Sequence, residues 1–174
     1  MNDNDIYDIL FPAMSGFFTD QGIDVEVVRA YHPTSEGLPE VPVVQLHKIS
    51  DRRYGWPYRK TDVSDYTTER TTEQIIETTF QVSGYSRLSV NSTYTTSDLM
   101  KLLSGFMQSD GFIATLEAAD IEIIRITDLR TNYVKDEMDR WEESTSFDFV
   151  IFHDQITIEE INEVESVELS INRV

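Results

Sequence analysis

The sequence predicts an α+β fold, in which two main helices pack on one face of a mostly antiparallel sheet and a long β-hairpin arm projects from that sheet. Two segments repeat apolar residues at helical spacing, and several others alternate apolar and polar residues as strands do. Residues 50–71 show no helical period. A chain of 174 residues fits one domain, which we assign to residues 1–174 with the arm at about 50–72.

The first expected element is a helix over residues 5–18. Asp3 or Asn4 is placed to cap its start, and Gln21-Gly22 to end it. Pro12 lies inside the pattern, so we expect a kink or a helix that restarts there. The apolar residues share one stripe: Ile6, Ile9, Leu10, Ala13, Met14, Phe17 and Phe18.

Three strands are expected next, over residues 23–31, 43–49 and 72–87. The third shows the clearest alternation, because one set of side chains is mainly apolar and the other polar, as in a sheet with one wetted face. The inward set is Ile76, Thr78, Phe80 and Val82. Residues 50–71 are long for an idle connection, and we interpret them as a hairpin arm.

In the second half of the chain we expect another helix, whose start has a capping box formed by Thr95 and Asp98. A short helix over 112–119 and strands over 121–127 and 146–153 follow. Residues 128–145 are polar and charged and are expected to form a long loop. Residues 156–163 fit no element clearly, and alternation at Val167, Leu169 and Ile171 predicts a last strand.

Charge and composition exclude several functions. The chain has 32 acidic and 14 basic residues, a net charge of −18, which opposes unassisted binding to nucleic acid or anionic lipid. It has no cysteine, and no segment long and apolar enough to cross a membrane. His32, His47 and His153 are isolated, and no phosphate-binding or nucleophile motif occurs. We therefore expect no metal, no cofactor and no catalytic residue.

The arm contains the most distinctive set of residues. Five of the 14 basic residues lie between positions 48 and 60, interleaved with aromatic residues. One interpretation is a solvated hairpin, and the other is a docking arm, because Arg, Tyr and Trp dominate protein interfaces. Contact with nucleic acid is a third, which the net charge opposes. The candidate interface residues are Arg52, Arg53, Tyr54, Trp56, Tyr58, Arg59 and Lys60, with Arg140 and Trp141 as a second candidate site.

The layout resembles that of bacteriophage neck or tail terminator proteins. The resemblance rests on DIYDILFP at 5–12, the strand at 43–49, the long arm, and EQIIETTFQVSG at 73–84 followed by a helix at 98–107. It ends with a charged segment closing in RWEESTSFDF at 140–149. It implies a non-enzymatic virion protein without cofactors. Such proteins form a ring, usually a hexamer, which caps the tail tube at the neck and joins the tail to the head connector protein.

The resemblance also implies further partners and a place of assembly. The ring would assemble in the host cytoplasm, contact the tail tube protein and, in a contractile tail, the sheath protein. DNA would pass through the lumen without specific binding. Three alternatives stay open: a head-completion or connector ring protein, an acidic DNA mimic that blocks a DNA-binding protein, and a hydrolase that uses a carboxyl group in an apolar pocket.

Overall fold

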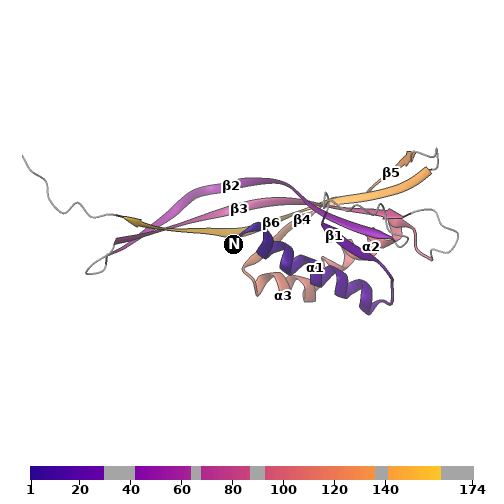
Figure 1. The fold of residues 1–174 in the computed structure, drawn as a ribbon, viewed down its shortest axis with the longest axis horizontal. Coiled ribbons are helices and arrows are strands. Elements are labelled where there is room, and N and C mark those ends of the chain that lie inside the picture. The colour runs from indigo at the N-terminus through magenta and orange to yellow at the C-terminus, as the bar shows by residue number, and fades with distance from the viewer. Residues whose placement is uncertain (30–41, 64–67, 87–92, 136–140, 162–174) are drawn as a thin grey trace, which may run out of the picture.

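The computed structural model describes residues 1–29, 42–63, 68–86, 93–135 and 141–161. Three helices lie along one side of a six-stranded sheet, and part of the sheet extends well beyond them (Figure 1). The predicted α+β class is confirmed. The elements in chain order are α1 (Asp3–Asp20), β1 (Glu26–Arg29), β2 (Val43–Val63), β3 (Thr68–Ser86), α2 (Thr96–Phe106), α3 (Asp110–Glu117), β4 (Ile121–Ile126), β5 (Arg130–Lys135) and β6 (Trp141–Ile161).

The sheet has the strand order β1-β2-β3-β6-β4, and β5 pairs with another part of β6. Strand β1 runs parallel to β2, and every other pair is antiparallel. The central strand β3 pairs with β2 on one side and with β6 on the other along nearly its whole length. The sheet is therefore built around three very long strands.

The arm consists of three strands, because β6 continues beside the hairpin of β2 and β3. The pairing of β3 with β6 runs without a register shift from Ser86 opposite Glu143 to Thr68 opposite Ile161. The predicted hairpin is confirmed. The undecided segment after residue 155 is strand up to Ile161, and the last strand expected around Val167 lies outside the described residues.

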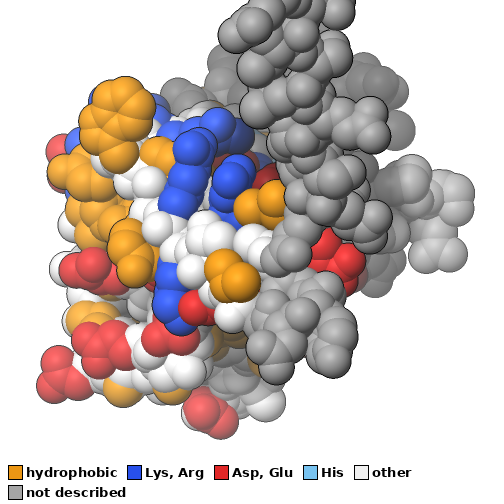
Figure 2. Space-filling view, turned by 90° about the vertical axis from the view of Figure 1, so that its left-hand side faces the viewer, with side chains coloured by type: hydrophobic (Ala, Val, Ile, Leu, Met, Phe, Trp, Pro, Cys, Tyr) orange, Lys and Arg blue, Asp and Glu red, His pale blue; other side chains and the backbone are white. Residues whose placement is uncertain are grey.

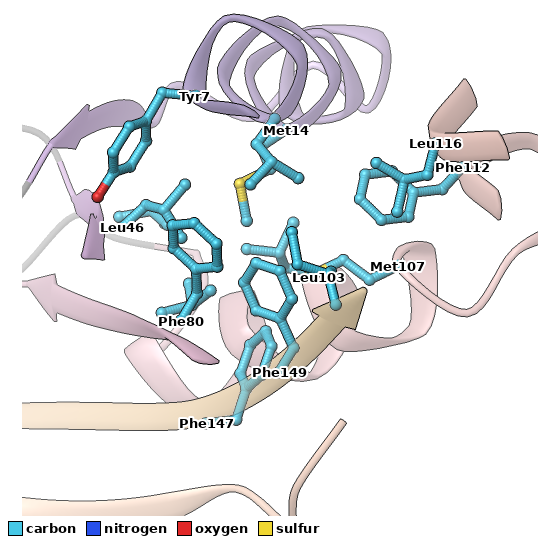
Figure 3. Close-up of a cluster of buried hydrophobic side chains, with 14 of the residues drawn as sticks. Tyr7, Met14, Leu46, Phe80, Leu103, Met107, Phe112, Leu116, Phe147 and Phe149 are labelled. Carbon is cyan, nitrogen blue, oxygen red and sulfur yellow. The ribbon is translucent and has the colours of Figure 1, made fainter. Parts of the chain in front are cut away.

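The core lies between the helices and the inner half of the sheet (Figure 3). All four residues of the predicted inward set on β3 are buried, which confirms the alternation. The rings of Phe80 and Phe149 stack 5.3 Å apart, and Tyr7 meets Phe80 edge-on at 5.6 Å. These aromatic contacts fix α1 against the neighbouring strands β3 and β6.

Helix α1 differs from its prediction at both Asn2 and Pro12. Asn2, and not Asp3 or Asn4, is the N-cap: its side chain accepts from the Asp5 N–H, and the Asp5 carboxylate accepts from the Asn2 N–H. This reciprocal capping box satisfies two backbone donors, which a later start would leave unpaired. The helix does not restart at Pro12 but contains it.

The predicted loop over residues 128–145 is wrong. Arg130–Lys135 forms β5, which pairs with Trp141–Ser146 at the start of β6. The Arg130 guanidinium binds the Asp148 carboxylate at 2.6 Å, and the hydroxyls of Thr131 and Thr145 lie 3.1 Å apart. Cross-strand polar contacts of this kind hold a hairpin together without the apolar alternation that identifies strands in a sequence.

Gly84 is required where α2 crosses β3. A Cβ atom at this position would lie 2.6 Å from Thr96 Cγ2 and 3.1 Å from Met100 Cε, both on the buried side of α2. We expect Gly84→Ala to push α2 away from the sheet and to lower the free energy of unfolding by about 1–3 kcal/mol. Urea denaturation followed by circular dichroism measures this, and Gly105→Ala, where a Cβ meets no atom within 4 Å, is the control.

Candidate assembly surface on the arm

The outer edge of β2 carries a bulge that displays Trp56. Pairing with β3 is interrupted between Tyr54 and Tyr58, and Gly55 has a positive φ of 70°, a conformation that favours glycine. The Gln74 side-chain amide donates to the Tyr54 carbonyl at 2.7 Å. This hydrogen bond replaces one that the bulge removes from the pairing of β2 with β3. Trp56 is 96% exposed. The bulge therefore holds a large aromatic side chain in solvent at a fixed place on the arm.

Three of the predicted arginines flank this bulge without an acidic partner. Arg53 and Arg59 pair with β3 on the face that carries the helices, and Arg52 lies on the opposite face. Within the described ranges, no carboxylate lies within ion-pair distance of these three guanidinium groups, whereas Lys60 binds Asp62 at 2.9 Å. Seen from the end of the arm, Lys and Arg side chains gather beside hydrophobic ones (Figure 2).

The face of the arm that points away from the helices carries several exposed apolar side chains. The Tyr54 ring lies 5.2 Å from that of Phe152 on β6. This face contains two predicted interface residues, Tyr54 and Tyr58, and three isoleucines that were not predicted. The alternation of Ile156 and Ile158 around Thr157 was the sequence pattern that could have indicated a strand here. Its exposed large side chains are Tyr54, Tyr58, Ile75, Ile156 and Ile158, between 43% and 64% exposed.

Lys48 belongs to the root of the arm and not to its exposed cations. Its ammonium contacts Asp3 of α1 at 2.7 Å and Asp51 of β2 at 2.6 Å. Burial acts to lower the pKa of Lys48, but the two carboxylates outweigh it and raise that pKa. Burial likewise acts to raise the pKa of Asp51, and its bonds to Lys48 and Thr78 lower it overall. The cluster ties the arm to α1 by charge.

The same cluster continues to His153 on β6. The Thr78 hydroxyl donates to Asp51 Oδ1 at 2.8 Å, so its oxygen accepts from His153 Nε2, 3.0 Å away. Nε2 therefore carries the hydrogen of the neutral ring. His153 Nδ1 is buried and has no hydrogen-bond partner among the residues that the structure describes. Charging the ring would place a proton on this buried nitrogen, and burial lowers the pKa of His153.

This burial predicts a pH dependence of stability. The pKa of His153 is lower in the folded than in the unfolded chain, so the unfolded chain binds more protons between the two values. The free energy of unfolding should therefore fall as the pH drops below about 6.5, the ordinary histidine value. We expect His153→Gln to flatten this part of the profile in urea titrations at pH 7, 6 and 5. Parallel profiles for the two proteins would contradict the assignment to His153.

The second candidate site is only partly described. Trp141 opens β6, where its backbone pairs with Lys135, and so it does not lie in a loop as expected. Arg140 lies outside the described residues.

Within the described part of the chain, no three His, Asp or Glu residues form a group that could hold a metal ion. No described helix has both the length and the apolar character needed to span a bilayer.

Comparison with solved structures defines the class of fold. The sheath/tube terminator of the PVC extracellular contractile injection system, in its extended state, matches with a TM-score of 0.50 at 9% identity. The match covers 100% of this chain and 64% of the terminator chain. A chain of the native gene transfer agent virion matches with a TM-score of only 0.28 at 13% identity, over 84% of this chain and 91% of that one. The fold is thus of the tail-terminator type.

A family model then identifies the chain more closely. The model described as E217 gateway protein gp29 matches residues 5–162, and the chain belongs to this family. No curated protein matches it. The resemblance to phage neck and tail terminator proteins is confirmed, and the chain is a structural component of the phage virion.

Proposed function

We propose that the protein forms a ring, a hexamer, which caps the tail tube at the neck and joins the tail to the head connector. The arm is the observation that carries this proposal. It extends beyond the helices as three paired strands (Figure 1). Its three arginines at 52, 53 and 59 form no ion pair within the described residues, and Trp56 is 96% exposed. Side chains of these types, exposed together on a rigid element, are typical of an interface that another subunit covers.

The charge distribution supports contact between copies. The chain carries a net charge of −18, so an arm with unpaired arginines is attracted to the rest of a neighbouring copy. A contact between two different surfaces of the same chain repeats from subunit to subunit and closes into a ring when the rotation allows it. Such a ring should bury well over about 1,000 Å² at each contact.

The same proposal covers activity, partners and location. The protein would act as a non-enzymatic joint that contacts the tail tube protein and, in a contractile tail, the last sheath ring. DNA would pass through the lumen without specific binding, because a lumen poor in unpaired cations gains little from phosphate contacts. Assembly would take place in the host cytoplasm.

Electron microscopy of the purified protein, alone and mixed with tail tubes, tests the proposal. We expect rings, or rings seated on tube ends, together with a ring-sized mass by mass photometry. Rings that bind isolated head connectors but not tubes would instead show a head-completion protein. A protein that stays monomeric in both settings would contradict the proposed function.

Charge reversal tests the role of the arm in the same assay. Arg53→Glu with Arg59→Glu should abolish rings, because repulsion replaces attraction at each contact. The matched control is Lys101→Glu with Arg125→Glu, which changes the net charge equally at exposed sites on α2 and β4. Equal loss of rings in both variants would show an effect of total charge and not of the arm.

A further inference from the structure

A cavity lined from β3, β4 and β6 is open to receive the arm of another copy. It has a volume of about 400 Å³, which lies in the range of pockets that hold a ligand of moderate size. Its apolar lining comes from Ile75 of β3, Ile121 of β4 and Phe152 of β6. These residues belong to three strands, so the paired backbone fixes the shape of the cavity.

Carboxylates surround this apolar lining. Glu117 ends α3, Asp120 connects α3 to β4, and Glu122 and Asp154 lie on β4 and β6. All four residues are exposed, and none forms an ion pair within the described part of the chain. Asp120 has a φ of 56°, which non-glycine residues seldom adopt and which aspartate tolerates better than most. The rim thus carries four carboxylates, and the Met1 ammonium lies beside it, where it donates to the Asp154 carbonyl at 2.9 Å.

The arm bulge is complementary to this cavity. Trp56 offers a flat apolar group, and Arg52, Arg53 and Arg59 beside it offer unpaired positive charges. At 96% exposure, Trp56 does not fill the cavity of its own chain. The bulge lies on β2, and the cavity is lined from β3, β4 and β6. The two features are neighbours in one chain, because Tyr54 before the bulge pairs with Ile75 of the cavity lining.

We propose that Trp56 of one copy docks into this cavity of the next copy, with the flanking arginines facing the carboxylates of its rim. The inference rests on the proposed ring and names the contact that closes it. In a ring the contact is heterologous: each copy gives its bulge to one neighbour and its cavity to the other, so every bulge and every cavity is used. The apolar lining accommodates the indole, and the charges fix its orientation.

A charge swap separates this contact from other modes of assembly. Glu117→Arg with Glu122→Arg should abolish rings as fully as Arg53→Glu with Arg59→Glu, and the four changes in one chain should restore them. The readouts are ring counts by electron microscopy and mass photometry, with thermal unfolding as the check that each variant folds. The control pair, Asp8→Arg with Asp20→Arg, reverses two exposed carboxylates of α1 away from the cavity.

Thiol cross-linking gives a second measurement that keeps Trp56 intact. The chain has no cysteine, so Arg59→Cys with Glu122→Cys introduces the only two thiols. Within one chain these two positions lie on opposite faces of the sheet and in different rows of its pairing, which disfavours a link inside one copy. A short flexible bis-maleimide should join copies into a ladder, with about tenfold more product than when Ala114→Cys replaces Glu122→Cys, because docking raises the local thiol concentration.

The outcomes distinguish the inference from the proposed function. Rings that persist in the Glu117→Arg, Glu122→Arg variant, or wild-type rings whose cysteine variant gives no ladder, would overturn the docking and leave the ring in place. Dimers formed by Arg59→Cys alone would show arms that pack against arms, and would also overturn it. The absence of any ring from the wild-type protein would overturn both.

Discussion

Truncation of Trp56 to alanine is expected to prevent ring formation at micromolar concentration without changing the fold. The side chain is 96% exposed in the isolated subunit, so its removal takes nothing from the core. At a protein interface, a central tryptophan typically contributes about 2 kcal/mol or more, which corresponds to about 30-fold in affinity at each contact. A ring loses this amount at every contact, so its population should fall steeply.

Mass photometry across a dilution series measures this loss, and circular dichroism confirms that the variant folds. Tyr133→Ala is the matched control, because Tyr133 is a 65% exposed aromatic residue on β5, away from the arm. If the two variants assemble alike, Trp56 is not an interface anchor and the bulge has another role.

Truncation of Phe80 to alanine should give the largest loss of stability. Phe80 is fully buried, stacks on Phe149 at 5.3 Å and meets Tyr7 edge-on. The cavity left behind lies at the junction of α1, β3 and β6 and cannot collapse without moving all three. The expected cost is about 3–5 kcal/mol, a large share of the roughly 5–15 kcal/mol that a domain has in total.

Urea denaturation gives the free energy of unfolding for this comparison. Ile124→Ala removes a side chain that is 45% exposed on β4, and should cost less than about 1 kcal/mol. A Phe80→Ala variant as stable as Ile124→Ala would mean that the aromatic cluster is not the centre of the core.

The parts of the fold that bury one face were predictable from the sequence. In the inner half of β3, apolar and polar residues alternate because only one side of residues 76–82 faces the core. The capping box of Thr95 and Asp98 predicted the start of α2. The outer half of β6 and the whole of β5 gave no such signal. Their strands are stabilised by backbone pairing with a neighbour, while their side chains stay exposed, so hydrophobic periodicity does not report them.

The candidate site was likewise predictable only in part: the arm could be found from the sequence and the cavity could not. Unusual residue types within one short segment marked the arm, because arginines and aromatic residues between positions 52 and 60 stand out in so acidic a chain. The cavity could not be found by that route. Ile75, Ile121 and Phe152 meet only through strand pairing, and Glu117 and Glu122 are two of 32 acidic residues.

The unbroken pairing of β3 with β6 gives the molecule a mechanical property. Phe149 in the core and Ile158 near the tip belong to one strand, and the same holds for Phe80 and Thr71 on β3. Tension applied to the outer end of β6, along the strand axis, therefore loads the hydrogen bonds between β3 and β6 in shear. Many of these bonds must break together before β6 slides along β3. The arm acts as a stiff lever, and tension applied at its far end is passed directly to the aromatic residues beneath α1.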